Sequence, residues 1–237
     1  MQDSNSRQAA IRLGTHGEDY GNWMPVSMLR LVRGLLALTV VLADRQTAGR
    51  GRYDRIWSSA SGEGLWMTAL VRPHILPEQA PWFTLGAAVA VAESLVAFGY
   101  PAGIKWPNDV LVAQEGPLFR RKLCGIRAEM DVAEDGTLSW INVGIGLNLL
   151  QEQFEGSLKD VAASLRMLGE DVPDRAQCAC AVLDKLEEMG DIFEREGFAP
   201  VRRRWLDLAL GLGSEATVRD IEGEQRGVVR DLDEEGH

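Results

Sequence analysis

The chain has 237 residues, 46% hydrophobic and 25% charged, which is enough for one large domain or two unequal ones with a buried core. Its formal net charge of −10 at pH 7 argues against nucleic-acid binding as the main role, since such surfaces are rich in Lys and Arg. No apolar stretch approaches the roughly 18 residues of a membrane span, and residues 1–12 lack the layout of a signal peptide, so we expect a cytoplasmic protein.

The first part of the chain is predicted to hold a helix and a strand before a basic loop. Residues 1–21 are polar and are expected to be irregular, and Pro25 is typical of the first turn of a helix that ends near Gly34. The β-branched run Thr39–Asp44 predicts a strand. A loop rich in Gly and Arg over Gln46–Trp57 follows it.

The middle of the chain is predicted to alternate strands with one long helix. Pro81–Phe98 is Ala-rich and largely apolar and precedes Gly99, so we expect a well-buried helix with a glycine C-cap. Lys122–Asp131 and Leu138–Leu149 flank a turn at Glu134-Asp135-Gly136 and predict a hairpin, so part of the sheet is expected to be antiparallel. Further strands are expected over Leu65–Arg72, Ile104–Trp106 and Val110–Val112.

The last part is predicted to be helical, with a small β unit at its end. Helices are expected from Ser157 as a cap, from Pro173 to about Gly197, and over Ala199–Leu208. Apolar and polar residues alternate over 216–221 and 225–231, on either side of a turn at Glu222-Gly223, which is typical of a hairpin. The sequence stops where another strand would be expected. We therefore predict domains over residues 1–212 and 213–237.

The segment Lys105-Trp106-Pro107-Asn108-Asp109 combines a cation, an aromatic ring, an amide and a carboxylate between two predicted strands. Pro107 lacks a backbone donor and biases Trp106 towards extended geometry, so the segment is not helix interior. Lys105 and Asp109 can then face one cavity from opposite sides. The alternative is a surface turn with an exposed ion pair.

The loop Gly49-Arg50-Gly51-Arg52 is the second motif. Its glycines permit positive φ and expose backbone N–H groups, while its arginines supply donors for carboxylate or phosphate. Gln46 offers a donor and an acceptor, which suit a ureido group, and Trp57 offers a stacking face for a base. On an acidic chain this basic loop suggests a small anionic ligand. The alternatives are a solvated basic loop and a core tryptophan.

Two glycine-containing strands complete the set. Lys122 begins an apolar strand that contains Gly125, and its ammonium can project into a pocket; the alternative is an exposed hairpin lysine. Gly144 and Gly146 lack the third glycine of a dinucleotide-binding fingerprint. They do permit a ligand to approach the backbone closely.

The three cysteines and three histidines exclude several kinds of site. The cysteines are odd in number and form no disulfide framework, and Cys178 and Cys180 have no nearby His, so we expect no zinc site. The histidines are scattered, which leaves a Ser-His-Asp or Cys-His mechanism little to build on.

Taken in order, these motifs resemble those of the biotin protein ligase family. The similar stretches are 43–52, 55–58, 105–109, 122–126, 143–148, and 193–200 with Trp205, and the resemblance spans about residues 40–237. It implies an α+β catalytic domain on a mixed sheet, related to class II aminoacyl-tRNA synthetases, followed by a small SH3-like β-barrel that is incomplete here. It also implies a two-step reaction. Biotin and ATP give biotinyl-5′-AMP and pyrophosphate, and a lysine of a biotin carboxyl carrier domain then attacks the adenylate.

The resemblance also implies roles for individual residues. The catalytic residues would be Arg52, Lys105, Asp109 and Lys122. Biotin would contact Asn22, Gln46, Gly49, Arg50, Gly51, Arg52, Lys122, Gly125, Gly144 and Gly146. ATP or the adenylate would contact Arg52, Arg55, Trp57, Asn108, Lys122 and Asn148. Use of ATP implies Mg²⁺, although we expect no dedicated metal ligands from the protein.

The sequence departs from the family pattern in three places. The family usually carries Ser-Thr-Asn for the biotin ureido group, and here only the Asn is matched, by Asn22. Glu115-Gly116-Pro117 resembles an inserted loop. The C-terminal barrel is short. No winged-helix segment precedes the catalytic part, so we expect a ligase without a DNA-binding role. A homodimer is left open. The alternatives are a lipoate or octanoyl ligase of related fold and a degenerate biotin-binding protein without transfer activity.

Overall fold

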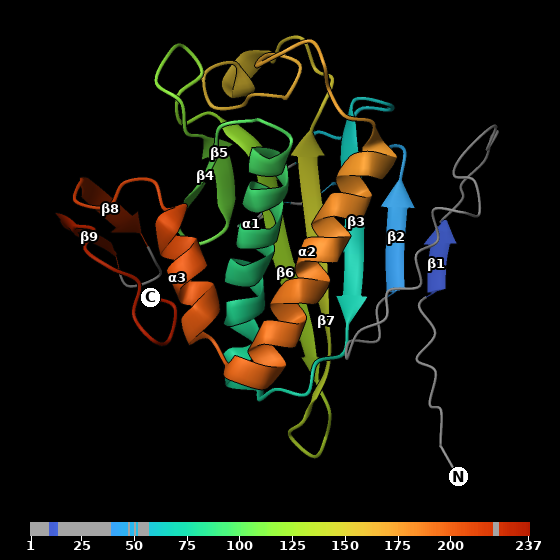
Figure 1. Ribbon diagram of the computed structural model, residues 1–237, viewed down its shortest axis with the longest axis vertical. Helices are drawn as coiled ribbons and strands as arrows, with labels where there is room; N and C mark the ends of the chain where they lie inside the picture. The colour runs from blue at the N-terminus through green and yellow to red at the C-terminus, as the bar shows by residue number, and fades with distance from the viewer. Residues whose placement is uncertain (1–9, 14–38, 47, 50, 52–56, 220–222) are drawn as a thin grey trace.

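The computed structural model describes residues 10–13, 39–46, 48, 49, 51, 57–219 and 223–237 (Figure 1). Its strands are β1 (Ala10–Leu13), β2 (Thr39–Ala43), β3 (Gly64–Val71), β4 (Ala102–Lys105), β5 (Asp109–Val112), β6 (Lys122–Val132), β7 (Leu138–Asn148), β8 (Glu215–Arg219) and β9 (Glu224–Val228). Its α-helices are α1 (Ala80–Ala97), α2 (Arg175–Glu196) and α3 (Ala199–Asp207), and short 3₁₀ turns span Pro77–Gln79 and Gly156–Leu158.

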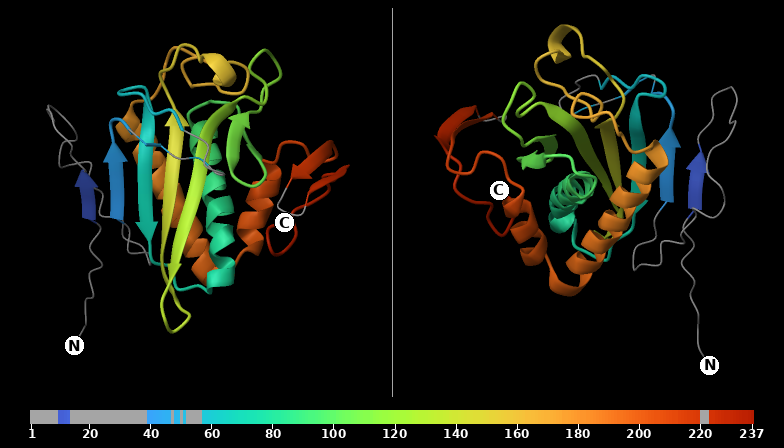
Figure 2. Two further views of the ribbon diagram at one scale, coloured as in Figure 1. Left: turned by 180° about the vertical axis from the view of Figure 1, so that it is seen from behind. Right: turned by 45° about the horizontal axis from the view of Figure 1, so that its top comes forward.

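One mixed sheet of seven strands organises the fold, in the order β1-β2-β3-β7-β6-β5-β4. Every neighbouring pair is antiparallel except β1 and β2, which are parallel. The helices α1, α2 and α3 lie on one face of the sheet, and the view from behind shows the opposite face in front of them (Figure 2). β8 and β9 form a separate hairpin beside α3. The predicted α+β class with a mixed sheet is confirmed.

The core lies between the sheet and the two long helices. α1 is largely apolar, and most of its residues are buried, which is typical of a core helix. Its small residues let α2 approach, since a Cβ on Gly86 would lie only 2.8 Å from the Phe193 ring. By length and composition Pro77–Ala97 could cross a membrane, but 67% of that stretch is buried inside the protein, as in a core helix.

A cluster of charges joins the three helices. Arg204 of α3 donates to both carboxylate oxygens of Glu93 on α1 and, at 2.5 Å, to Glu188 on α2. Lys185 of α2 lies 3.1 Å from Glu93 and 2.8 Å from Glu188. Each cation bridges both carboxylates, so the cluster fixes the helices relative to one another.

Two sequence predictions are wrong in instructive ways. Residues 1–21 were expected to be irregular, but Ala10–Leu13 forms the edge strand β1, which gains its hydrogen bonds by pairing with β2. Ser157 was expected to cap a helix, but only a 3₁₀ turn forms there and Ser157 makes no cap. The next residues pair with β6 instead, because the Lys122 N–H donates to the Val161 carbonyl at 2.8 Å and the Ala163 N–H to the Lys122 carbonyl at 2.9 Å.

The other predicted elements in the described part form within a few residues of their expected bounds. α2 begins at Arg175 rather than Pro173, because Asp174 and Gln177 form a capping box with bonds of 2.7 and 2.9 Å. The hairpin turn at 134–136 forms as predicted, with Gly136 at a φ of 83°. The helix expected at Pro25 lies outside the described residues.

Candidate functional site

A pocket of about 1020 Å³ opens on the face of the sheet opposite α1, α2 and α3. It collects residues from distant parts of the chain: the loop after β2, β3, the turn between β4 and β5, the connection from β5 to β6, β6 itself, the middle of β7 and the segment 158–161. Of the predicted residues that the structure describes, those that line it are Gln46, Gly51, Trp57, Lys105, Asn108, Asp109, Lys122, Gly125, Gly144 and Gly146. Arg50, Arg52, Arg55 and Asn22 lie outside the described residues, so their roles stay predictions.

Glycines make the floor of the pocket flat. Trp57 lies directly on the sheet, since a Cβ on Gly146 would be 2.7 Å from its Nε1 and a Cβ on Gly125 would be 2.8 Å from its ring. Gly144 is not covered in this way, because the atoms nearest to a Cβ built on it would be the Arg127 carbonyl oxygen at 3.5 Å and the Thr68 hydroxyl at 4.0 Å. The floor therefore has an aromatic-covered part and an open part, on which a ligand can lie against the backbone.

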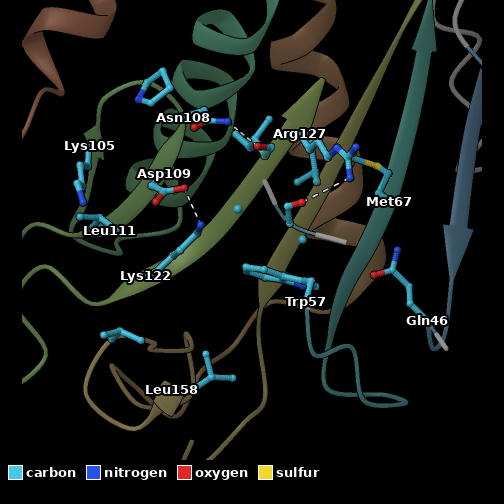
Figure 3. A pocket seen from close by; sticks show the side chains of 18 of the residues that line it. Gln46, Trp57, Met67, Lys105, Asn108, Asp109, Leu111, Lys122, Arg127 and Leu158 are labelled. Atoms are coloured by element: carbon cyan, nitrogen blue, oxygen red, sulfur yellow. Dashed lines mark hydrogen bonds and ion pairs between the residues drawn. The ribbon is translucent and has the colours of Figure 1, made fainter. Parts of the chain in front are cut away.

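An ion pair lies at the centre of the pocket. Lys122 Nζ is 2.6 Å from Asp109 Oδ1, and both side chains are about one-third exposed, at 30% and 33%. Lys122 Nζ also lies 5.4 Å from the Trp57 ring centroid, within cation–π range. In Figure 3 Trp57 lies between this pair and Gln46. Beneath the pair, burial raises the pKa of the Cys124 thiol, so this cysteine stays protonated and is no nucleophile.

The turn that carries Asp109 is held from several sides. Lys105 and Asp109 are paired residues of β4 and β5, so their side chains share the pocket face as predicted. The Asn108 amide donates to the Ile126 carbonyl at 2.6 Å and is buried. Asn108 therefore fixes the turn to β6. Its contact with the adenylate stays a prediction. The Trp106–Pro107 peptide bond is cis.

Three tryptophan side chains attach this turn and α1 to later parts of the chain. Trp205 Nε1 donates to the Pro107 carbonyl at 3.4 Å, and Trp106 Nε1 donates to the Gly236 carbonyl at 3.0 Å. Trp82 Nε1 donates to the Glu235 carbonyl at 3.2 Å. The C-terminal segment, anchored by the buried Leu232, therefore contacts the turn that carries Asp109 through Trp106.

The neck of the basic loop is also well defined. The Trp57 N–H donates to the Gly49 carbonyl at 2.9 Å, and a Cβ on Gly49 would collide with the Trp57 carbonyl. The Ser59 hydroxyl donates to Gln46 Oε1 at 2.6 Å, which leaves the Gln46 NH₂ group as the donor on this side of the pocket. Glycine at 49 is therefore required for the two ends of the loop to meet.

Asn148 is placed differently from the other predicted residues. It is buried, does not line the pocket, and its amide donates to the Ala163 carbonyl at 3.0 Å and the Lys122 carbonyl at 3.4 Å. These bonds join β6 and β7 to the segment that follows them. Its predicted contact with the adenine side stays untested.

Some pocket residues escaped the sequence reasoning. Arg127 faces the pocket, pairs with Glu129 at 2.7 Å and lies 3.5 Å from the Gly51 carbonyl. Its position two residues after Gly125 on the same strand was the signal that could have found it. Phe119, Arg120, Leu158 and Val161 also line the pocket. They come from connecting segments, where no periodicity indicates which way a side chain points.

Comparison with known proteins gives a consistent result. The model of the biotin/lipoate A/B protein ligase family matches residues 29–148. The bifunctional ligase/repressor BirA of Bacillus subtilis is 39% identical over 201 residues, covering 84% of this chain and 60% of that protein. The biotin–[acetyl-CoA-carboxylase] ligase of Mycobacterium tuberculosis is 37% identical over 205 residues, covering 83% and 71%. The chain thus spans about 60% of the length of the bifunctional relatives.

A solved structure shares the fold. The biotin protein ligase from Aquifex aeolicus, in complex with biotin and ATP, superposes with a TM-score of 0.70 at 29% identity, covering 84% of this chain and 79% of that one.

Proposed function

The chain belongs to the biotin/lipoate A/B protein ligase family, and we propose that it is a biotin–protein ligase. It would join biotin to ATP, forming biotinyl-5′-AMP and pyrophosphate, and would then pass the biotinyl group to a lysine of a biotin carboxyl carrier domain. Relatives named as biotin–[acetyl-CoA-carboxylase] ligases, at 37% and 31% identity, favour biotin over lipoate as the substrate.

The observation that carries the proposal is the Lys122–Asp109 pair at the centre of the glycine-floored pocket. Neither step of such a reaction needs a nucleophile from the enzyme. Each is a displacement between bound reactants, so charge neutralisation and positioning are what the protein must supply. A cation and a carboxylate on rigid strands, beside a flat floor, provide these two things.

In the first step a carboxylate oxygen of biotin attacks the α-phosphorus of ATP, and pyrophosphate leaves. Lys122 would lie between the two anions, reduce their repulsion and stabilise the charge that builds up on the α-phosphate. Gln46 would donate to the ureido end of biotin, and Gly144 would let the ring system lie on the strand. Trp57 would provide the surface for the adenine side. Arg50 and Arg52 would close the loop over both ligands, as the resemblance implies.

In the second step the carrier lysine attacks the acyl carbon, and AMP leaves. That amine must be neutral to act as a nucleophile, so it has to lose a proton before or during the attack. Asp109 lines the pocket beside Lys122, and it would orient this amine and accept the proton. Lys105, its cross-strand neighbour, would steady the leaving phosphate.

Mg²⁺ is expected to arrive with ATP. This ion usually keeps several waters and is held by one or two carboxylates together with the phosphates. Asp109 and Asp160 are pocket carboxylates that fit such a role. When bound, the ion would neutralise phosphate charge. The role without DNA binding that the sequence led us to expect stays a prediction, and the homodimer stays open.

The proposal is tested by incubating the protein with MgATP, biotin and a carrier domain and measuring the carrier mass. We expect one biotinyl adduct per carrier, dependent on ATP and absent when the target lysine is replaced by Arg. Lipoate offered in place of biotin should give no adduct. A lipoyl adduct alone would assign the lipoate branch of the family. Pyrophosphate release with no adduct on any carrier would instead indicate a protein that has lost the transfer step.

A further inference from the structure

Arg120 has an unusual backbone conformation at the mouth of the pocket. Among the described residues it is the one non-glycine residue with a positive φ, at 60°. An L-residue with a side chain is disfavoured there, and glycine is the usual occupant. Arg120 also belongs to the connection from β5 to β6, which includes the stretch that departs from the family pattern at Glu115-Gly116-Pro117.

A β-bulge holds Arg120 in this conformation. Its N–H donates to the Val112 carbonyl at 2.9 Å, while the Val112 N–H donates to the Arg121 carbonyl at 2.9 Å, so two residues oppose one. Such bulges re-aim side chains near functional sites. The neighbouring arginines accordingly diverge. Arg121 donates to the Lys159 carbonyl at 2.7 Å and lies 3.7 Å from Asp160, whereas Arg120 lines the pocket.

The charge of Arg120 is not neutralised by a neighbour. Lys122 is paired with Asp109 and Arg127 with Glu129. Within the described part of the chain, no carboxylate lies within 4.0 Å of the Arg120 guanidinium, which instead packs 5.2 Å from the centroid of the Phe119 ring. This contact with the ring steadies the side chain and leaves its N–H donors available.

Arg120 lies on the same side of the sheet as the central ion pair. The register pairs Lys105 with Asp109 and Leu111 with Lys122, and all four line the pocket. Arg120 precedes Lys122 by two residues and lines the pocket beyond it. Lys105 is exposed and likewise has no carboxylate within 4.0 Å in the described part. The pocket therefore carries uncompensated positive charge on both flanks of β5.

We propose that Arg120 binds the β- and γ-phosphates of ATP and, after the first step, the departing pyrophosphate. This inference rests on the proposed function. If Lys122 meets the α-phosphate, the next two phosphates carry most of the remaining negative charge and need cations that are not already paired. A guanidinium matches two phosphate oxygens with two parallel N–H donors, which a lysine cannot do.

Arg120→Gly tests the proposal with little risk to the fold, because glycine adopts a φ of 60° without strain. The dissociation constants of MgATP, pyrophosphate and AMP are measured for the wild type and the variant, together with the KM values of biotin and the carrier. We expect MgATP and pyrophosphate binding to weaken about tenfold, with AMP, biotin and carrier changed less than about twofold. The melting temperature should not fall.

Two further variants sharpen the test. Arg120→Lys keeps the charge without the paired donors and should recover part of the lost affinity. Arg203→Ala removes an exposed arginine of α3 outside the pocket and should leave every constant unchanged, which controls for net charge.

Three outcomes would overturn the inference. Arg120→Gly could bind MgATP and pyrophosphate as tightly as the wild type, or its affinity for AMP could fall as much as its affinity for MgATP. The third outcome is a rise confined to the KM of the carrier, which would indicate that Arg120 contacts an acidic protein surface. If the wild type makes biotinyl-5′-AMP and Arg120→Gly binds ATP equally well, this inference alone fails. A wild type that makes no adenylate and binds no ATP overturns the proposed function together with it.

Discussion

At the scale of single residues, the proposed function divides the two steps of the reaction between Lys122 and Asp109. The two side chains are 2.6 Å apart and partly exposed, so water screens their attraction and the pair adds little to stability. Their proximity matters more for chemistry. A cation that is already ordered by a carboxylate needs little rearrangement when anionic reactants enter, and the carboxylate is then beside the point where the carrier amine must arrive.

This division predicts different effects of Asp109→Asn on the two steps. The amide keeps the shape and can still bond to a neighbour, but it cannot accept a proton from the carrier amine. We expect transfer from preformed biotinyl-5′-AMP to slow by about 10²-fold, with a much smaller change in adenylate formation. Single-turnover measurements of each step separate the two. Asp131→Asn, at the exposed far end of β6, is the matched control, and an equal loss in both steps would contradict the assignment.

At the scale of elements, the antiparallel β6–β7 hairpin and the short β4–β5 hairpin bring the site together. The register places Gly125 opposite Gly146 and Arg127 opposite Gly144, so three of these four neighbouring positions carry no side chain. The β4–β5 turn places Asp109 over its edge. On the opposite face the helices pack against the sheet and support it. The charge cluster that joins these helices, made by Glu93, Lys185, Glu188 and Arg204, can be tested by mutation.

The charge cluster predicts a pH-dependent part of the stability. Burial by itself would raise the pKa of Glu93, but hydrogen bonds from Arg204 and Lys185 outweigh it and hold that pKa below the ordinary value of 4.5. The pKa of Glu188 is lowered by the same two partners against its own burial. Because the folded-state pKa values are depressed, the stabilisation is present above the unfolded value of about 4.5 and is lost as the pH falls through the folded values.

Urea unfolding of the wild type and Glu93→Gln at several pH values measures this effect. We expect the variant to be less stable by about 1–2 kcal/mol at pH 7 and the difference to shrink below pH 4.5. Glu115→Gln, in an exposed loop, should show no difference at any pH. A Glu93→Gln penalty that is constant from pH 7 to pH 3 would show that packing, and not the charge, is responsible.

At the scale of the whole molecule, the sequence predicted the elements better than their ends and connections. The buried helix over Pro81–Phe98 and the β6–β7 hairpin could be predicted because composition and turn residues both indicated them. The helix at Ser157 was wrong because a distant partner, Lys122, takes the backbone donors and acceptors of that segment. No local pattern encodes that pairing.

The site shows the same contrast. Lys105, Asp109, Lys122 and the floor glycines were found because their residue types are chemically informative in short motifs. Arg120 was missed because its direction depends on the bulge opposite Val112, which exists only once the end of β5 has paired with the residues before β6. The link from the C-terminal segment to Trp106 was missed because it joins residues 130 positions apart.

The proposed activation of biotin at Lys122, on the face of the sheet opposite α1, α2 and α3, is tested most directly by one measurement. Biotinyl-5′-AMP formation from biotin and MgATP is followed in a single turnover for the wild type, Lys122→Ala and the exposed-lysine control Lys159→Ala. We predict that Lys122→Ala slows adenylate formation by about 10²–10³-fold, or about 3–4 kcal/mol of lost transition-state stabilisation, while the control matches the wild type. Adenylate formation at the wild-type rate in Lys122→Ala would contradict the account.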